Sequence, residues 1–599
     1  IMDTQKYSVN QHLIETLLAW VKSGEIAIPE IQRPFVWDAS KVRDLMDSLY
    51  QGYPIGYIIT WLNPNVRLKD GTTATGKKVL IDGQQRVTAL TAAILGQYVV
   101  TKDYKRVRIK IAFNPITEKF EVQTPIILRD KTWIPDISEI LDGQSNSFSY
   151  INTYLAENPS MDKDHAVKSI SKLFDLTKKQ VGLIDLAADL DIETVTEIFI
   201  RINAQGVVLS QADFVMSKIA ANEQYGGQDI RKAIDYFSHL AIAPEFFQYI
   251  ADNDKDFAKT DFFQKMTWLK NENEDLYDPK YTDVLRVAFS TQFNRGKLSD
   301  LVSLLSGRNF ETRTFEADIA EASFNKLSDG IHQVINETNF KRFVMIIKSA
   351  GFIHTKMVRS QNVINFAYIL YLRLRAKGEN QGNIESYVRR WFVFSVLTGR
   401  YSGSPESMFD LDLRQMEITP FAEYLAQKEE ANLSEAFWSA SLVQSLNSSV
   451  SSSPYFNAYL ASQVKANDKG FLSKEITVSD LITYRGDIHH IFPKNYLKKS
   501  GLPRGKYNQI ANYVYMQQEV NIQVGDKAPE IYLGDMLKQC QDQGLKYGGI
   551  DRLEELHQNL ENNCIPESVF TMNIEDYDEF LLARRKLMAK KMKDYYYSL

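Results

Sequence analysis

The chain has 599 residues, 44% of them hydrophobic and 24% charged, and its 70 lysines and arginines against 75 aspartates and glutamates give a net charge of −5. This composition is typical of a soluble globular protein and excludes a mainly disordered chain or a fibrous repeat. The two cysteines, Cys540 and Cys564, exclude a disulfide framework and a structural zinc knuckle. No apolar run is long enough to span a bilayer and no signal peptide is recognised, so we expect a cytoplasmic protein without a membrane partner.

The first part of the chain alternates helical and extended patterns. Apolar residues recur at helical spacing up to a stop at Gly24, and again after Trp37 and Asp38. Runs rich in β-branched and aromatic residues predict buried strands between these segments. The predicted helices cover 13–21, 42–49 and 87–95, and the predicted strands cover 26–28, 55–62, 79–81, 106–113 and 120–122. The pattern predicts an α+β domain, which we place over residues 1–220.

The rest of the chain is mostly helical. Helical spacing with short polar connectors continues through the middle of the sequence, and a Ser-rich stretch over 448–454 marks a border region. An extended segment follows over 486–493, and an amphipathic helix is predicted over 574–597. The predicted fold class is therefore α+β and predominantly helical, with a helical middle region over 221–450 and a C-terminal domain over 451–599.

The most informative segment of the C-terminal domain is DIHHIFP at residues 487–493, which places two of the eight histidines side by side. Asn512, Asn521 and Lys527 follow it. A neutral imidazole can take a proton from water, and a divalent ion held by nitrogen and oxygen ligands can stabilise a phosphate under attack. An asparagine can supply a ligand or orient the base. These residue types favour metal-assisted phosphodiester hydrolysis. A structural histidine pair, with the asparagines in turns or caps, is the alternative.

Two polar stretches interrupt the apolar pattern of the first domain, IPEIQRPFVW at residues 28–37 and IDGQQR at 81–86. The second follows a predicted strand and opens a predicted helix. A helix N-terminus with a glycine turn, amide side chains and an arginine suits an anion such as a phosphate. Asp82 could orient Arg86 or bind a magnesium ion carried by a nucleotide. A helix-capping Asp82, with Arg86 paired to an acid inside the fold, is an equally good interpretation.

Together, the two N-terminal stretches resemble the ParB-like N-terminal domain of GmrSD-type restriction enzymes, whose motifs I-P-x-x-Q-R-x-x-x-W and D-G-Q-Q-R are both intact here. FIRINAQGVVLS at 199–210 and RYSGS at 400–404 also resemble segments of this family. The HHIFP tail resembles the HNH (ββα-metal) nucleases, in which a metal ligand on a strand precedes the general-base histidine. The resemblance spans most of the chain and extends to single-chain, BrxU- and SspE-like proteins. It implies a ParB-like nucleotide-binding or sensor domain, a helical middle and an HNH nuclease domain.

The resemblance also implies roles for individual residues. It makes His490 the general base and Asn512 the residue that orients it. A divalent metal, magnesium or manganese, would be bound by His489, Asn521 and Asp487. A nucleotide, GTP or ATP, would contact Asp82, Gly83, Gln84, Gln85 and Arg86. A sensor or nucleotide pocket would contain Gln32, Arg33, Trp37, Arg201 and Asn203. DNA would contact Lys494 and Lys527.

The function implied by the resemblance is that of a nucleotide-regulated, metal-dependent DNA endonuclease, which would restrict phage DNA with modified cytosines or a phosphorothioate backbone. Its partners would be double-stranded DNA and a nucleotide, and the oligomeric state is open, with a homodimer as one option. Two other functions remain open: a non-catalytic, nucleotide-sensing regulator that binds DNA, and an RNase that uses the same HNH site. The terminal helix is expected to turn a basic face to a phosphate backbone, with Arg584, Arg585, Lys586, Lys590, Lys591 and Lys593 on it.

Overall fold

The computed structural model describes most of the chain as two compact units. The described residues are 5–27, 37–62, 78–100, 106–190, 194, 195, 198, 211–484, 486–541 and 544–599. Unit 1 comprises Ile1–His239, Asp254–Phe263 and Leu298–Ser328, and unit 2 comprises Leu240–Asn253, Gln264–Lys297 and Asp329–Leu599. Helices predominate over small sheets, which confirms the predicted fold class, α+β and predominantly helical. The domain boundaries at 220 and 450 remain predictions.

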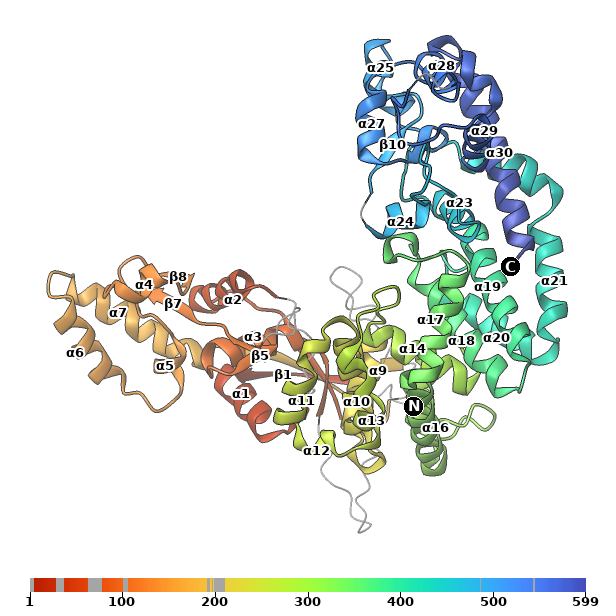
Figure 1. Cartoon of the computed structure of the whole chain (residues 1–599). Coiled ribbons are helices and arrows are strands. Elements are labelled where there is room, and N and C mark those ends of the chain that lie inside the picture. The colour runs from red at the N-terminus through yellow and green to blue at the C-terminus, as the bar shows by residue number, and fades with distance from the viewer. Residues whose placement is uncertain are drawn as a thin grey trace. The chain divides into compact units, whose positions relative to one another are not determined.

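A five-stranded sheet in the order β1-β9-β3-β4-β2 forms the centre of unit 1 (Figure 1). β4 pairs antiparallel with β3 and parallel with β2, while β9 pairs parallel with β3 and antiparallel with β1. Ile58 and Leu80 from this sheet belong to one buried core with Leu17, Met46 and Leu90 from the helices. The strands are Tyr7–Leu13 (β1), Ile26–Ala27 (β2), Tyr57–Leu62 (β3), Lys78–Asp82 (β4) and Gln180–Leu186 (β9).

The first helices of unit 1 lie where the sequence predicts them. α1 (Ile14–Ser23) ends at Gly24, whose φ of 78° is left-handed. α2 (Ala39–Gln51) is capped by Asp38, which accepts a 2.9 Å hydrogen bond from the main-chain nitrogen of Lys41. The other elements within this unit include α3 (Gln84–Ile94), β5 (Tyr98–Val100), β6 (Arg106–Arg108), β7 (Ile111–Asn114), β8 (Lys119–Val122), α4 (Pro125–Arg129), α5 (Ser138–Leu141), α6 (Ser147–Glu157), α7 (Lys163–Phe174), α9 (Gln211–Ala221), α12 (Lys255–Ala258) and α15 (Leu298–Leu305).

Unit 2 is built mainly of helices with an aromatic-rich interior. α18 contacts both α14 and α19, and the rings of Phe343 and Tyr368 stack at 4.6 Å between centroids. Three helices, α10 (Gly227–Ile242), α13 (Asp261–Lys265) and α16 (Ala317–Ile335), cross a unit boundary. The helices of unit 2 before the C-terminal sheet include α11 (Phe247–Asn253), α14 (Tyr281–Phe293), α17 (Glu337–Ser349), α18 (Gln361–Ala376), α19 (Gln381–Thr398), α20 (Pro405–Ile418), α21 (Phe421–Asn432), α22 (Leu442–Ser445), α23 (Pro454–Lys465) and α24 (Val478–Thr483).

The C-terminal part of unit 2 has a core of its own, to which Phe492, Tyr532 and Phe580 contribute. Two short strands pair near this core and are surrounded by helices (Figure 1). Among the described residues, no helix is both long and apolar enough to cross a bilayer. The elements of this part are β10 (Ile488–His490), α25 (Lys494–Lys499), α26 (Arg504–Tyr507), η7 (Ile510–Asn512), β11 (Tyr513–Tyr515), α27 (Gln518–Val524), α28 (Pro529–Gln539), α29 (Leu553–Asn562) and α30 (Tyr577–Tyr597).

Candidate functional site

The histidine pair lies on β10, the first of two antiparallel strands. His489 stands opposite Val514 and His490 stands opposite Tyr513 on β11. The helix α27, which carries Asn521, begins three residues after β11 ends. β10 ends at His490, and Pro493 stands at the N-cap position of α25. In chain order, α25, α26 and η7 lie between the two strands, and α27 follows the second strand.

The His490 ring is half-buried and held by two neighbours. Its Nε2 lies 3.0 Å from the side-chain oxygen Oδ1 of Asn508, and its edge meets the Tyr513 ring at 5.4 Å. Because an amide oxygen only accepts, Nε2 carries the proton and Nδ1 keeps its lone pair. Burial lowers the pKa of His490, and the hydrogen bond to Asn508 only partly opposes this. The ring is therefore a neutral imidazole near neutral pH, the form that a general base requires.

The His489 side chain differs from its neighbour in what it contacts. Its Nε2 is buried and has no hydrogen-bond partner in the described part of the chain. Burial lowers the pKa of His489, and the charge of Asp487 partly opposes this. A neutral imidazole with an unpaired nitrogen is a common metal ligand. Within the described residues, no three or more His, Cys, Asp or Glu side chains lie close enough to hold a metal together.

Asn512 is fully buried and binds the main chain rather than the histidine ring. Its Oδ1 accepts a 2.8 Å hydrogen bond from the nitrogen of Phe492, and its Nδ2 donates to the carbonyls of Phe492 and Tyr507 at 3.0 and 3.3 Å. The asparagine that contacts the His490 ring is Asn508, which the sequence reasoning missed because no spacing rule singled it out. A role for Asn512 in orienting His490 is therefore indirect, through the segment that follows β10.

The other two predicted ligands are solvent-accessible. Asn521 is half-buried on α27, and Asp487 is exposed just before β10. Asp487 lies near enough to His489 to affect the pKa of its imidazole. Their joint binding of a metal stays a prediction.

The basic residues around the site fall into two groups. Lys494 is exposed, and its charge contributes to the low pKa of His490. Lys527 is instead tied down, because its Nζ donates to the Tyr547 hydroxyl at 2.9 Å and to the Gln523 carbonyl at 3.1 Å. Exposed cations of this region that have no acidic partner among the described residues are Lys494, Lys498, Arg504 and Lys506.

The terminal helix α30 does not present all its basic residues to solvent. Arg584 was expected on a phosphate-facing surface, but its side chain is fully buried. It donates to the carbonyls of Asn563, Ala511 and Tyr513 at 3.2, 2.9 and 2.7 Å. α30 packs against both η7 and α23, and Arg584 lies on the buried side of the helix. The expectation for Arg584 is corrected: it is a structural cation inside the C-terminal core.

The D-G-Q-Q-R motif lies at the junction of β4 and α3. Arg86 donates through Nη2 to Asp82 at 3.0 Å and through Nη1 to the Ile55 carbonyl at 3.0 Å. Gly83, with φ of 99°, makes the turn between strand and helix. Gly56 lies against Nη1 of Arg86 with a left-handed φ of 87°, so a residue with a side chain would be strained there. The motif thus forms the internal arginine–acid pair that the sequence allowed as an alternative to nucleotide binding.

The remaining residues of the motif and of the predicted sensor pocket are placed only in part. Gln84 is buried and Gln85 half-buried on α3. Trp37 packs against the core of unit 1. Four predicted residues lie outside the described part of the chain: Gln32, Arg33, Arg201 and Asn203.

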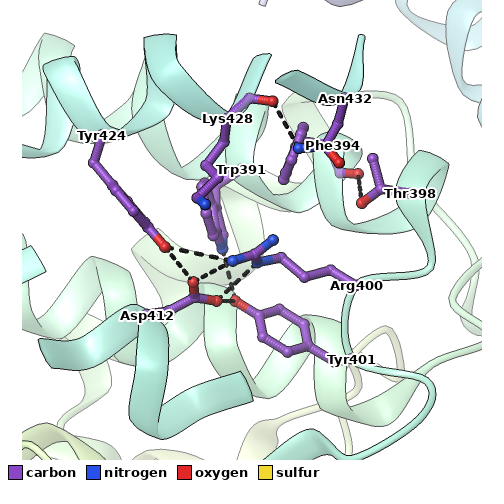
Figure 2. Close-up of polar contacts among 9 residues, drawn as sticks. All are labelled: Trp391, Phe394, Thr398, Arg400, Tyr401, Asp412, Tyr424, Lys428 and Asn432. Atoms are coloured by element: carbon purple, nitrogen blue, oxygen red, sulfur yellow. Dashed lines mark hydrogen bonds and ion pairs between the residues drawn. The ribbon is translucent and has the colours of Figure 1, made fainter. Parts of the chain in front are cut away.

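Arg400 and Tyr401 of the RYSGS segment belong to a polar cluster in the helical part of unit 2 (Figure 2). Asp412 accepts hydrogen bonds from Arg400 Nε at 2.8 Å, from the Tyr401 hydroxyl at 2.7 Å and from the Tyr424 hydroxyl at 2.6 Å. Trp391 donates to the Tyr401 hydroxyl at 3.0 Å. The cluster pairs its own charges, which indicates a structural role.

Comparisons with known proteins concern first the N-terminal part of the chain. Residues 14–220 match the family described as "GmrSD restriction endonuclease, N-terminal domain". This match supports the GmrSD-type N-terminus that the two motifs predict. An uncharacterized protein of Methanocaldococcus jannaschii is 22% identical over 649 residues, which cover 97% of this chain and 98% of that protein. The similarity to the archaeal protein therefore runs through both units.

Proposed function

We propose that the chain is a metal-dependent endonuclease that cuts DNA at the His489–His490 site. The observation that carries the proposal is the different bonding of the two adjacent imidazoles. His490 has one nitrogen fixed by Asn508, and His489 has a buried nitrogen without a partner. A purely structural histidine pair would be expected to have its buried nitrogens satisfied.

His490 is the general base in this proposal. Asn508 holds the proton on Nε2, so Nδ1 can take a proton from the attacking water. The low pKa that burial gives His490 keeps it ready for this step near neutral pH. Exposed cations such as Lys494 bind the phosphate backbone beside it.

A divalent metal is proposed to bind at His489. Its Nε2, which has no partner among the described residues, would be the nitrogen ligand, and Asn521 and Asp487 would supply oxygen donors. When bound, such an ion stabilises negative charge on the phosphate and the leaving oxygen.

We further propose that the N-terminal domain regulates cleavage and directs it to modified foreign DNA. The support is the match of residues 14–220 to a restriction endonuclease domain. GTP or ATP would bind at the Asp82–Arg86 motif, where a phosphate competes with Asp82 for the guanidinium of Arg86.

Plasmid nicking in magnesium or manganese tests the nuclease proposal. His490→Ala should lose cleavage by roughly 100-fold or more, the usual contribution of a general base. His557→Ala is the matched control, because His557 is a half-buried histidine of the same unit whose Nδ1 lies 3.5 Å from Glu567. Retained cleavage by folded His490→Ala would refute the assignment of the base.

A substrate panel tests the finer parts of the proposal. It contains unmodified, hydroxymethylated, glucosylated and phosphorothioated DNA, each with and without GTP or ATP, and an RNA duplex. Cleavage that requires one DNA modification supports the restriction role. Preferential cleavage of RNA would favour an RNase, and binding without any cleavage would favour a regulator.

A further inference from the structure

We propose that Arg584 is a positioning residue of the His490 site. It acts from α30 by fixing the main chain of residues 511–513, which lies opposite His490. The inference rests on the proposed function, since it assigns a residue to that same site.

The contacts of Arg584 are unusual for a buried cation. The side chain is fully buried, yet no carboxylate lies within ion-pair distance of it among the described residues. Its charge is stabilised by the carbonyls of Asn563, Ala511 and Tyr513 and by the Tyr459 ring at 5.9 Å. A buried charge without such partners is strongly unfavourable, so these carbonyls are held firmly where the guanidinium needs them.

Two of these carbonyls flank Asn512, the residue that ties the main chain after β10. The carbonyl of Asn512 accepts a 2.9 Å hydrogen bond from the nitrogen of Ile491. Its side chain holds both the nitrogen and the carbonyl of Phe492. These two residues directly follow His490. Arg584 therefore holds residues 511–513 in place, and these residues in turn hold Ile491 and Phe492 at the end of β10.

One of these two contacts, to the Tyr513 carbonyl, bears more directly on the His490 ring. Tyr513 is the cross-strand partner of His490, and the edge of one ring meets the other at 5.4 Å. A shift of the Tyr513 main chain would move the Tyr513 ring, and the His490 ring that packs on it would then point its Nδ1 in another direction. Displacements of about 1 Å in an active site can cost on the order of 100-fold in rate.

The helix that carries Arg584 is itself firmly anchored. The Phe580 ring packs on Phe492 at 4.9 Å, one turn before Arg584. Further along α30, the Tyr596 hydroxyl donates to Glu429 at 2.7 Å and the Tyr595 hydroxyl donates to the Ala350 carbonyl. α30 thus connects the helical part of unit 2 with the site (Figure 1). Through Arg584, α30 makes a hydrogen bond to the Tyr513 carbonyl of β11.

A second buried arginine in the same unit provides the matched control. Arg400 is largely buried, with 9% of its side chain exposed, but its charge is paired with Asp412 (Figure 2). Its neighbours Tyr401, Tyr424 and Trp391 lie in the helical part of unit 2. An Arg-to-Lys change at either position keeps the positive charge and loses the planar, multidentate donor set.

The test compares Arg584→Lys and Arg400→Lys by two measurements. The first is steady-state cleavage, with kcat and KM for DNA determined separately. The second is the ring resonance of His490 in protein labelled at histidine, assigned with His490→Ala. Arg584→Lys should lower kcat by roughly 10- to 100-fold with KM within about twofold, and should shift the His490 resonance. Arg400→Lys should do neither once the folded fraction is matched.

The proposal is overturned if Arg584→Lys and Arg400→Lys affect kcat equally, or if the His490 resonance does not move. If the wild-type protein cuts no DNA, the proposed function fails, and the resonance alone decides whether Arg584 positions the ring. Arg584→Gln serves as a second variant with a neutral amide donor. If neither Arg584 variant folds while Arg400→Lys does, Arg584 acts in folding and the positioning role is refuted.

Discussion

The two motif regions of this protein differ in how their polar groups are used. In unit 1, Arg86 is bonded to Asp82 and to a main-chain carbonyl, so the motif stabilises its own turn. In unit 2, the His489 Nε2 is buried without a partner in the described chain, and Lys494 is exposed without an acid. The D-G-Q-Q-R motif lies within residues 14–220, which match a restriction endonuclease domain, and the HHIFP segment lies outside this match. The better candidate for a catalytic site is therefore the region whose polar atoms lack hydrogen-bond partners within the described chain, whatever the strength of its sequence motif.

Among the variants proposed for unit 1, replacement of Arg86 is expected to have the largest effect, which is on nucleotide hydrolysis. Arg86→Ala should abolish hydrolysis of GTP or ATP if the motif binds a nucleotide, since the phosphate loses its cation. The control is Arg108→Ala, because Arg108 also pairs with an acid of the same unit, Asp136, at 3.1 Å. Both variants should lose about 1–3 kcal/mol of unfolding free energy. Hydrolysis that survives in both Arg86→Ala and Asp82→Ala would leave the motif with only its structural role.

Removing the orienting amide of the C-terminal site should have the next largest effect. Asn508→Ala should lower kcat/KM for DNA cleavage by roughly 10-fold, because the ring loses its fixed tautomer. The hydrogen bond raises the pKa of His490, so its loss should move the acid limb of the pH–rate profile to lower pH. Gln509→Ala is the control, since Gln509 binds the Gly505 carbonyl instead. An unchanged profile in Asn508→Ala would show that this amide does not tune the base.

The lowered pKa values of the two histidines predict the sign of the pH dependence. Burial places both below the ordinary value of about 6.5. The acid limb of kcat/KM should therefore have its midpoint below pH 6.5. Stability should fall as pH drops below about 6.5, because the unfolded chain then binds more protons than the folded one, and this loss should level off below the folded-state pKa. Urea unfolding between pH 5 and 7 measures this loss of unfolding free energy. His490→Ala should flatten the dependence of the unfolding free energy on pH. An unchanged dependence would contradict the burial argument.

The smallest expected effect is on DNA binding, where Lys494 and Lys527 should differ although both were predicted from the sequence to contact DNA. Lys494→Ala should weaken DNA binding a few-fold and reduce the slope of log affinity against log salt by about one. Lys527→Ala should leave that slope unchanged, because Lys527 is committed to Tyr547 and Gln523. Fluorescence anisotropy with a labelled duplex at several salt concentrations gives both values. Equal slopes for the two variants would remove the distinction.

Local features of the fold could be predicted well because they depend on local chemistry. Gly24 ends α1, and Asp38 opens α2, where periodicity and stop signals place them. Asn508 and Arg584 could not be assigned in this way. Each acts through a contact with a residue 18 or more positions away, and no spacing rule encodes such contacts. The amphipathic pattern even favoured an exposed Arg584, because a buried arginine bonded to main-chain carbonyls looks the same in sequence as a surface one.

Manganese binding followed by electron paramagnetic resonance tests the central claim, a metal-assisted hydrolytic centre at His489 and His490, most directly. Wild-type protein is expected to bind a manganese ion that His489→Ala loses, while His557→Ala retains it. Identical manganese binding by the wild type and His489→Ala would contradict the assignment of this strand as a metal centre.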